Sequence, residues 1–316
     1  MSARARPALL VAGHGTRDTD GVADFGRFME RLRARMPVTV AGGFIELSPP
    51  PLTEVVSGLY GEGHRHVVTV PLVLVAAGHG KGDIPGAMAR EIIRHPGLSY
   101  TYGRPLGPHP TLLALLEERM RAALGSTPVD ETTAVLLVGR GSTDPDANAE
   151  VHKVARLFWE GRGAAGPAQA GGLMGVEPAF VSLAHPSVPE GLERLRKLGA
   201  RRIVVLPYFL FRGVLPDRVA DAARSYAADH AEVDIRRAEV IGDCDGLAGV
   251  VIERYEEALA GDIRMNCDTC VYRIAMPGFE HRVGAPQTPH DHPEDPADGH
   301  GHGRGHEHGH GHAHAH

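Results

Sequence analysis

Cysteine is scarce in this chain of 316 residues, which contains only three. An odd, low count does not describe a disulfide framework, and the C-x-x-C pair Cys267 and Cys270 favours metal or redox use instead. Long apolar runs are also missing, because the longest covers residues 67–77 and is interrupted by Thr69. It falls short of the ~18 residues that a membrane-spanning helix needs. The apolar stretch after Arg6 is too brief for a secretory signal, so we expect a cytoplasmic protein that crosses no membrane.

A strong excess of charge is absent from most of the chain. The net charge is -6 with histidine neutral, and -4 of it lies in residues 290–316, so the rest carries -2. A nearly neutral body argues against nucleic-acid binding as the main function. With 42% hydrophobic and 23% charged residues the composition is globular. The length favours one large domain or two domains of ~150 residues.

Short β-branched segments alternate with helical segments along the chain. The segments expected as strands are 8–12, 38–45, 67–75, 98–102, 134–138, 177–183, 202–209 and 234–240. The segments expected as helices include 22–36, 52–60, 84–94, 111–124 and 247–259. This alternation predicts an α/β fold whose mainly parallel sheet is covered by helices on both faces.

The second half of the pattern repeats the first. The segment A-L-L-V-A-G-H-G-T-R-D at 8–18 matches A-V-L-L-V-G-R-G-S-T-D at 134–144 with an offset of 126, and Phe44 matches Phe180 with an offset of 136. The difference comes from an insertion that includes the glycine-rich and alanine-rich stretch 161–172, which we expect to be a surface loop. The repeat therefore predicts two duplicated α/β lobes, at 1–126 and 127–262.

The composition changes after these lobes. Residues 277–316 are rich in proline, glycine and histidine, with ten His between His290 and His316 and almost no large apolar side chain. Burial cannot offset the entropy of ordering such a segment. We expect it to be a disordered tail that follows a cysteine-containing segment at 263–276.

Three polar residues of the first half lie at or just after the ends of expected strands: His14, Glu46 and His79. Ligands of open α/β sheets bind in the crevice at the carboxyl ends of the strands. Two imidazoles and a carboxylate suit Co²⁺, Fe²⁺, Ni²⁺ or Zn²⁺ and leave coordination positions open. A single histidine in a glycine-flanked loop is more often a hydrogen-bonded residue, but two such loops with an acid between them favour a metal site.

The second half lacks this set of residues, because Arg140 aligns with His14, Ser182 with Glu46 and roughly Leu215 with His79. Arg140 places a permanent cation at the same crevice, which favours an anionic ligand rich in carboxylates. Other basic residues that we expect to contribute are Arg17, Lys81, Arg104, Arg212 and Arg218. The chain contains neither a glycine motif for nucleotide phosphates nor a G-x-S-x-G element.

The segments L-L-V-A-G-H-G-T-R-D, G-F-I-E-L-S-P-P and V-P-L-V-L-V-A-A-G-H-G-K-G-D-I-P resemble those of the sirohydrochlorin chelatases of the CbiX type. The resemblance covers residues 8–260 and is to the long form, which implies two class II chelatase-like lobes with a cleft between them. It implies that His14 and His79 bind metal or accept protons, with Glu46 as their acidic partner. The reaction it implies is metal insertion into sirohydrochlorin, an octacarboxylate tetrapyrrole. We expect Lys81 and arginines of the cleft to bind its carboxylates.

Beyond the lobes, Met265, Cys267 and Cys270 resemble the M-x-C-x-x-C element that long members associate with an iron–sulfur cluster. Two cysteines cannot complete an ordinary cluster of four thiolates. Cys244, a non-protein ligand or a second chain in a homodimer would have to contribute, and otherwise the pair is a dithiol.

The identity of the metal stays open between cobalt and iron, because histidine and glutamate ligands suit both. The spaced H-x-H elements of the tail suggest a store for Co²⁺ or Ni²⁺. Long members with such a tail resemble the cobalt enzymes of cobalamin synthesis, so we expect Co²⁺, with Fe²⁺ insertion for siroheme as the alternative. A metal-storage or delivery protein without catalysis is the alternative from a different class.

Overall fold

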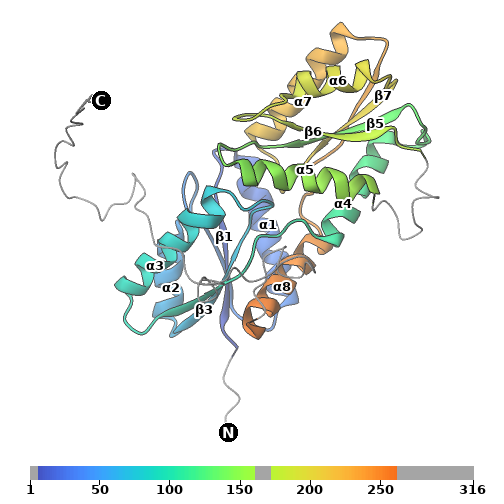
Figure 1. Cartoon of the computed structure of the whole chain (residues 1–316). Helices are drawn as coiled ribbons and strands as arrows, with labels where there is room; N and C mark the ends of the chain where they lie inside the picture. Colours follow the sequence, from blue (N-terminus) through green and yellow to red (C-terminus); the bar gives the residue numbers. More distant parts are fainter. Residues whose placement is uncertain (1–5, 161–171, 262–316) are drawn as a thin grey trace, which may run out of the picture.

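A computed structural model describes residues 6–160 and 172–261, which form two four-stranded parallel sheets (Figure 1). The first sheet has the strand order β2-β1-β3-β4 and the second the order β6-β5-β7-β8. Their strands are β1 (Ala8–Gly13), β2 (Val40–Phe44), β3 (His66–Pro71), β4 (Ser99–Tyr102), β5 (Thr133–Gly139), β6 (Gly175–Phe180), β7 (Arg202–Pro207) and β8 (Asp234–Arg237). The predicted α/β fold with two duplicated lobes is confirmed.

The central strands β1 and β5 are buried along their whole length. Side chains of β1 alternate between two apolar clusters, with Leu9 and Val11 in one and Leu10 in the other. The cluster that holds Leu9 continues into the second lobe, where it includes Val135 and Leu137 of β5. Uninterrupted apolar strands are therefore required here, because both faces of each sheet are covered.

Helices follow the strands in both lobes. They are α1 (Thr19–Arg35), α2 (Leu52–Gly61), α3 (Ile84–Arg94), α4 (Pro110–Leu124), α5 (Pro145–Glu160), α6 (Val188–Lys197), α7 (Val214–Asp229) and α8 (Asp245–Ala260), with a π-helical turn η1 (His79–Asp83) before α3. The side chain of Asp18 begins α1 by accepting a hydrogen bond from the backbone N–H of Gly21 at 2.7 Å. None of the helices in the described part of the chain is both long and apolar enough to span a membrane.

The two halves of the sequence exchange their last helices. The C-terminal helix α8 packs on β3, β4 and α1 of the first lobe, whereas α4 packs on β7, β8 and α5 of the second (Figure 1). Arg254 of α8 is fully buried and donates hydrogen bonds to the carbonyl oxygens of Pro105 and Leu106, at 3.1 and 3.0 Å. The predicted division at residue 126 follows the sequence repeat, whereas the packing assigns α4 and α8 to the opposite lobes.

Four strands end at least two residues earlier than the sequence predicts. Expected to end at residues 75, 183, 209 and 240, they end at Pro71, Phe180, Pro207 and Arg237. Residues 72–75 and 208–211 are apolar because they line the space between the lobes, and hydrophobicity alone does not separate such loops from strands. The insertion at 161–171, the segment with Cys267 and Cys270, and the tail at 277–316 lie outside the described residues.

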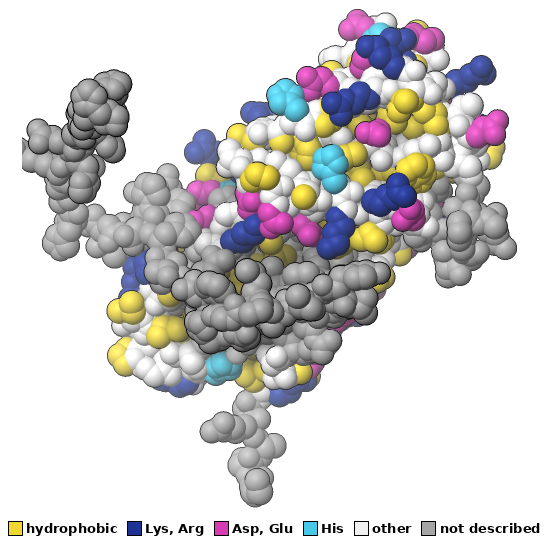
Figure 2. All heavy atoms as spheres, in the orientation of Figure 1, with side chains coloured by type: hydrophobic (Ala, Val, Ile, Leu, Met, Phe, Trp, Pro, Cys, Tyr) yellow, Lys and Arg dark blue, Asp and Glu magenta, His cyan; other side chains and the backbone are white. Residues whose placement is uncertain are grey.

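Charged side chains are distributed over both lobes. On the face shown in Figure 2, acidic and basic side chains are intermixed over the second lobe. This distribution agrees with the small net charge of the chain before residue 290.

Candidate active site

A cavity of about 680 Å³ lies between the two lobes, where the carboxyl ends of their strands face each other. It is lined by the loops that follow β1, β3, β5 and β7, and by single residues of the loops after β2 and β6. Its wall is largely apolar, with Leu74, Val75, Leu210 and Phe211 among the lining residues. We call this cavity the interlobe cleft. Its volume falls within the range of about 300 to 1,000 Å³ that is usual for small-molecule sites.

His14 lines the interlobe cleft, and Glu46 lies beside it. His14 Nδ1 is 3.1 Å from Glu46 Oε1, and the two side chains are 23% and 20% exposed. The parallel pairing of β1 with β2, which sets Gly13 opposite Phe44, brings the ends of these strands together. Backbone hydrogen bonds continue beyond the strands, because Glu46 N donates to His14 O at 3.1 Å. Two of the three predicted metal-site residues are therefore adjacent in space.

The loop that carries His14 is packed against the loop that carries Glu46. Gly15 has a φ of +107°, and a Cβ atom there would lie 1.9 Å from the carbonyl oxygen of Glu46, so only glycine fits. Thr16 N donates to Ser48 Oγ at 2.9 Å, and Ser48 Oγ donates back to Thr16 O. These contacts fix the backbone on both sides of the His14–Glu46 pair.

The second lobe repeats this loop packing without the metal-site residues. A Cβ atom on Gly141 would lie 1.8 Å from the carbonyl oxygen of Ser182, which occupies the position of Glu46. The backbone of Ser142, the counterpart of Thr16, is held by Asn148 of α5, whose side chain accepts from Ser142 N at 2.9 Å and donates to Ser142 O at 2.8 Å. The backbone of the site is thus duplicated, while the acid is not.

His79 is the first residue of η1, in the loop after β3. Its neighbours Gly78 and Gly80 both line the interlobe cleft, but the side chain of His79 lies outside the described part of the structure. Among the side chains that are described, no group of three or more His, Cys, Asp or Glu forms a metal cluster. The role of His79 therefore stays a prediction.

Arg17 and Arg140 line the interlobe cleft from opposite lobes. Both are exposed, and neither forms an ion pair within residues 6–160 and 172–261. A guanidinium group keeps its charge at any physiological pH and binds carboxylates through parallel hydrogen bonds. These two arginines can therefore bind an anionic ligand from both sides.

Lys81 and Arg212, two further predicted anion-binding residues, form ion pairs between the lobes instead. Lys81 Nζ lies 2.7 Å from Asp144 Oδ2 and 2.8 Å from Asp146 Oδ2. Although partial burial opposes it, the hydrogen bonds to the two carboxylates raise the pKa of Lys81. Both carboxylates belong to the second lobe and neutralise the charge of Lys81. A role of Lys81 in binding an anionic ligand stays a prediction.

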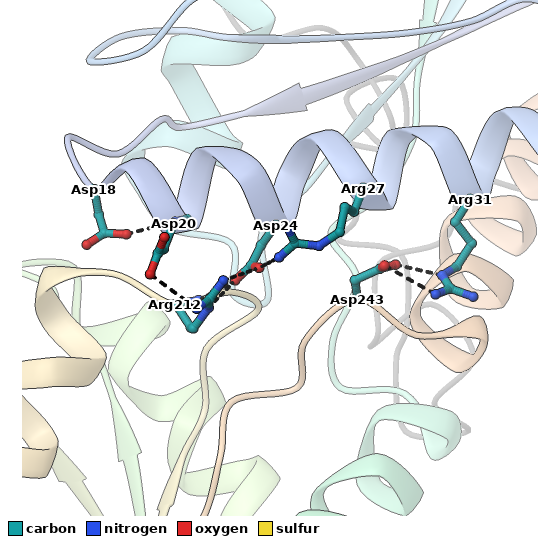
Figure 3. A network of polar contacts seen from close by, with 8 residues as sticks. Asp18, Asp20, Asp24, Arg27, Arg31, Arg212 and Asp243 are labelled. Atoms are coloured by element: carbon teal, nitrogen blue, oxygen red, sulfur yellow. Dashed lines mark hydrogen bonds and ion pairs between the residues drawn. The ribbon is translucent and has the colours of Figure 1, made fainter.

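Arg212 forms the corresponding link in the other direction (Figure 3). It donates to both carboxylate oxygens of Asp24 at 2.9 Å and to Asp20 at 3.2 Å. The hydrogen bond from Arg212 lowers the pKa of the buried Asp24 carboxyl. Each link runs from the loop after the third strand of one lobe to the start of the first helix of the other. We call these two ion-pair groups the interlobe links.

Arg104, another of the basic residues expected at the cleft, pairs with Glu257 of α8 at 2.6 Å.

Two cleft residues were missed by sequence reasoning. Leu47 and Leu183 line the interlobe cleft, and both have a positive φ, of 66° and 61°. A bulky residue in this region is an outlier that costs about 1 to 3 kcal/mol. The sequence repeat contains a signal for these two residues, because Leu47 and Leu183 are 136 residues apart and therefore occupy equivalent positions in the two halves.

Comparison with known proteins identifies the family. The family model described as CbiX matches residues 8–123 and again residues 134–258. A sirohydrochlorin cobaltochelatase of Priestia megaterium is 34% identical over 278 residues, which cover 87% of this chain and 86% of that protein. A sirohydrochlorin ferrochelatase of the same organism is 29% identical over 256 residues, which cover 80% of this chain and 91% of that protein.

A solved structure described as SirB from Bacillus subtilis with Fe3+ has the same arrangement of lobes. It superimposes with a TM-score of 0.69 at 26% identity, covering 81% of this chain and 97% of that chain. The double match of the family model agrees with the two sheets of equal strand order. The resemblance found in the sequence is confirmed, and the chain belongs to the CbiX family of chelatases.

Proposed function

We propose that this protein inserts a divalent metal ion into sirohydrochlorin, with Co²⁺ as the metal and Fe²⁺ as the alternative. The observation that carries the proposal is the placement of His14 beside Glu46, at 3.1 Å, on the wall of a cleft built by both lobes. Membership of the CbiX family supports it, because the cobaltochelatase and ferrochelatase relatives both act on sirohydrochlorin by name.

The chemistry of insertion explains the residue types. The two inner N–H protons of the macrocycle must leave as the metal ion enters, so the site needs weakly bound metal and a proton acceptor. Glu46 Oε1 lies 3.1 Å from His14 Nδ1, so the carboxylate adds negative charge beside an imidazole that can receive metal or a proton. His79, which starts η1 at the same cleft, supplies the second imidazole. Because only a small number of protein ligands holds the ion, it can transfer to the macrocycle.

The macrocycle carries its carboxylates around its edge, and the cleft offers cations from both lobes. Arg17 and Arg140 are the arginines we assign to these carboxylates, because both line the cleft without an ion-pair partner in the described chain. Lys81 and Arg212 are assigned first to the interlobe links, where they set the distance between the walls. Holding ring and metal in one geometry removes much of the entropic barrier to their reaction.

Cobalt is preferred over iron because the cobaltochelatase relative shares 34% identity and the ferrochelatase relative 29%. Parallel anaerobic insertion assays with Co²⁺ and Fe²⁺, followed by the absorption spectrum of the macrocycle, test the proposal. Faster insertion of Co²⁺ supports the proposal, and faster insertion of Fe²⁺ favours the alternative function in siroheme synthesis. If the protein inserts neither metal, the proposed activity is contradicted.

The C-terminal segment carries three proposals of its own. An iron–sulfur cluster at Cys267 and Cys270, a homodimer that shares it, and metal storage by the histidine-rich tail all concern residues outside the described chain. Iron and acid-labile sulfide analysis of the anaerobically purified protein tests the cluster. Removal of residues 277–316 tests the storage alternative, because a catalytic body still metallates sirohydrochlorin whereas a storage protein does not.

A further inference from the structure

Leu47 and Leu183 share an unusual combination of properties. Both lie in the interlobe cleft, both have a left-handed backbone, and their exposed fractions are 46% and 65%. Neither belongs to the apolar core clusters of the described residues. A large apolar side chain that is both strained and exposed at a cleft is a candidate for ligand contact.

The turn that holds each leucine does not itself require leucine. Ser48 N donates to Glu46 O at 2.8 Å, and Ala184 N donates to Ser182 O at 2.8 Å, so each leucine is the central residue of a three-residue turn. The form of this turn with positive φ is rare and strained. Glycine adopts it freely and asparagine tolerates it, so the fold is satisfied by either residue.

The two lobes provide an internal comparison at these turns. The residue before the leucine is Glu46 in one lobe and Ser182 in the other, and the residue after it is Ser48 or Ala184. The residues that flank the leucine therefore differ between the two lobes, whereas leucine occupies the strained position in both. A role common to both lobes explains this, and metal binding is not common to both.

We propose that Leu47 and Leu183 contact the apolar macrocycle of sirohydrochlorin from the two lobes. This inference rests on the proposed function and assigns substrate-binding residues within it. The ring system of a tetrapyrrole is flat and apolar, while its carboxylates lie at the edge. Leucine contacts to the ring thus complement Arg17 and Arg140, which line the same cleft and suit the edge.

Besides the carboxylate contact assigned to Arg140, the second lobe then contributes a contact to the ring. That lobe lacks counterparts of His14 and Glu46, yet Leu183 keeps the apolar contact that Leu47 makes beside the acid. Leu47 then holds the ring at the wall that carries the metal site, and Leu183 holds it at the wall that does not. Loss of Leu183 is therefore expected to weaken binding of the ring and to leave binding of the metal ion unchanged.

A titration of the full chain with metal-free sirohydrochlorin, followed by absorbance, tests the proposal. The variant is Leu183→Gly, and the matched control is Leu198→Gly at the end of α6, where the leucine is 66% exposed outside the cleft. Leu183→Gly should raise the Kd for sirohydrochlorin about tenfold or more, since burial of one leucine supports a factor of that order. The control should bind as the unsubstituted chain does.

Leu183→Asn provides a second variant that also tolerates the turn, and it should weaken binding similarly. Calorimetric titration with Co²⁺ alone should give the same affinity for all variants. Unchanged sirohydrochlorin binding by both Leu183 variants, or equal weakening by Leu198→Gly, overturns the assignment of the leucines alone. Failure of the unsubstituted chain to bind sirohydrochlorin overturns the proposed function, and this inference with it.

Discussion

Glu46 contacts His14 through both its backbone and its side chain. Its N–H donates to the carbonyl oxygen of His14 at 3.1 Å, and its Oε1 lies 3.1 Å from Nδ1 of the same residue. A carboxylate at this distance places a negative charge beside the imidazole and attracts a metal cation to it. The pair is therefore the part of the site on which the proposed chemistry depends most.

Glu46→Gln keeps a polar group beside His14 and removes the negative charge. We expect the rate of cobalt insertion to fall by about 10- to 100-fold, because loss of a carboxylate partner of a metal-binding histidine has effects of that size. The thermal midpoint should stay unchanged. Glu253→Gln is the matched control, since Glu253 pairs with His109 at 3.0 Å outside the cleft. Equal rates for the two variants would refute the role of Glu46.

Arg140→Ala removes one of the two cleft arginines without an ion-pair partner in the described chain. The KM for sirohydrochlorin should rise about tenfold, as expected for loss of one charge-assisted contact to a carboxylate. The increase should shrink at high salt, which screens exposed charges. Arg237→Ala, at an exposed position of β8 outside the cleft, should leave the KM unchanged. A KM for Arg140→Ala equal to that of this control would exclude the assigned contact.

Gly141→Ala tests the loop packing in the lobe without the metal-site residues. The new Cβ atom would lie 1.8 Å from the carbonyl oxygen of Ser182, at a φ of +88°. We expect the free energy of unfolding in urea to fall by about 1 to 3 kcal/mol. Gly58→Ala, on the exposed side of α2 with open space around it, should instead raise it by about 0.5 to 1 kcal/mol. A stable Gly141→Ala protein would show that the close approach is not needed.

Asp24→Asn tests the interlobe link at Arg212. Because Arg212 lowers the pKa of Asp24 in the folded protein, the ionised carboxylate stabilises the fold above the pKa of the unfolded chain, about 4. That stabilisation is lost as the pH falls through the lower pKa of the folded state. Asp24→Asn should therefore be less stable at pH 7, and its difference from the unsubstituted chain should shrink towards pH 3.

Urea unfolding at several pH values measures this difference. Asp221→Asn is a suitable control, since its pair with Arg224 is exposed on α7 and such pairs contribute little. A stability difference for Asp24→Asn that stays constant from pH 7 to pH 3 would contradict the assigned origin of the link.

The parallel sheets and the first half of the site follow from local sequence features. Alternating strands and helices predict the parallel sheets, and residues at adjacent strand ends must meet, which places His14 next to Glu46. The glycine at 15 is explained by the close approach of the Glu46 carbonyl, whereas Gly78 has open space around it. The flanking glycines of the two histidines thus have different physical reasons.

Other features depend on contacts between distant parts of the chain. An amphipathic helix such as α8 shows that one face is buried but not which sheet covers it, so the helix exchange was not predicted. Lys81 and Arg212 have acidic partners 63 and 188 residues away in the sequence. The strain at Leu47 and Leu183 is a property of the backbone that hydrophobicity does not record.

The most direct test of the proposed chemistry is the rate of anaerobic cobalt insertion into sirohydrochlorin by the His14→Ala, His79→Ala double variant. We expect insertion to be lost while circular dichroism shows an intact fold, because the two imidazoles receive the metal ion and the protons. Turnover close to that of the unsubstituted protein would contradict it.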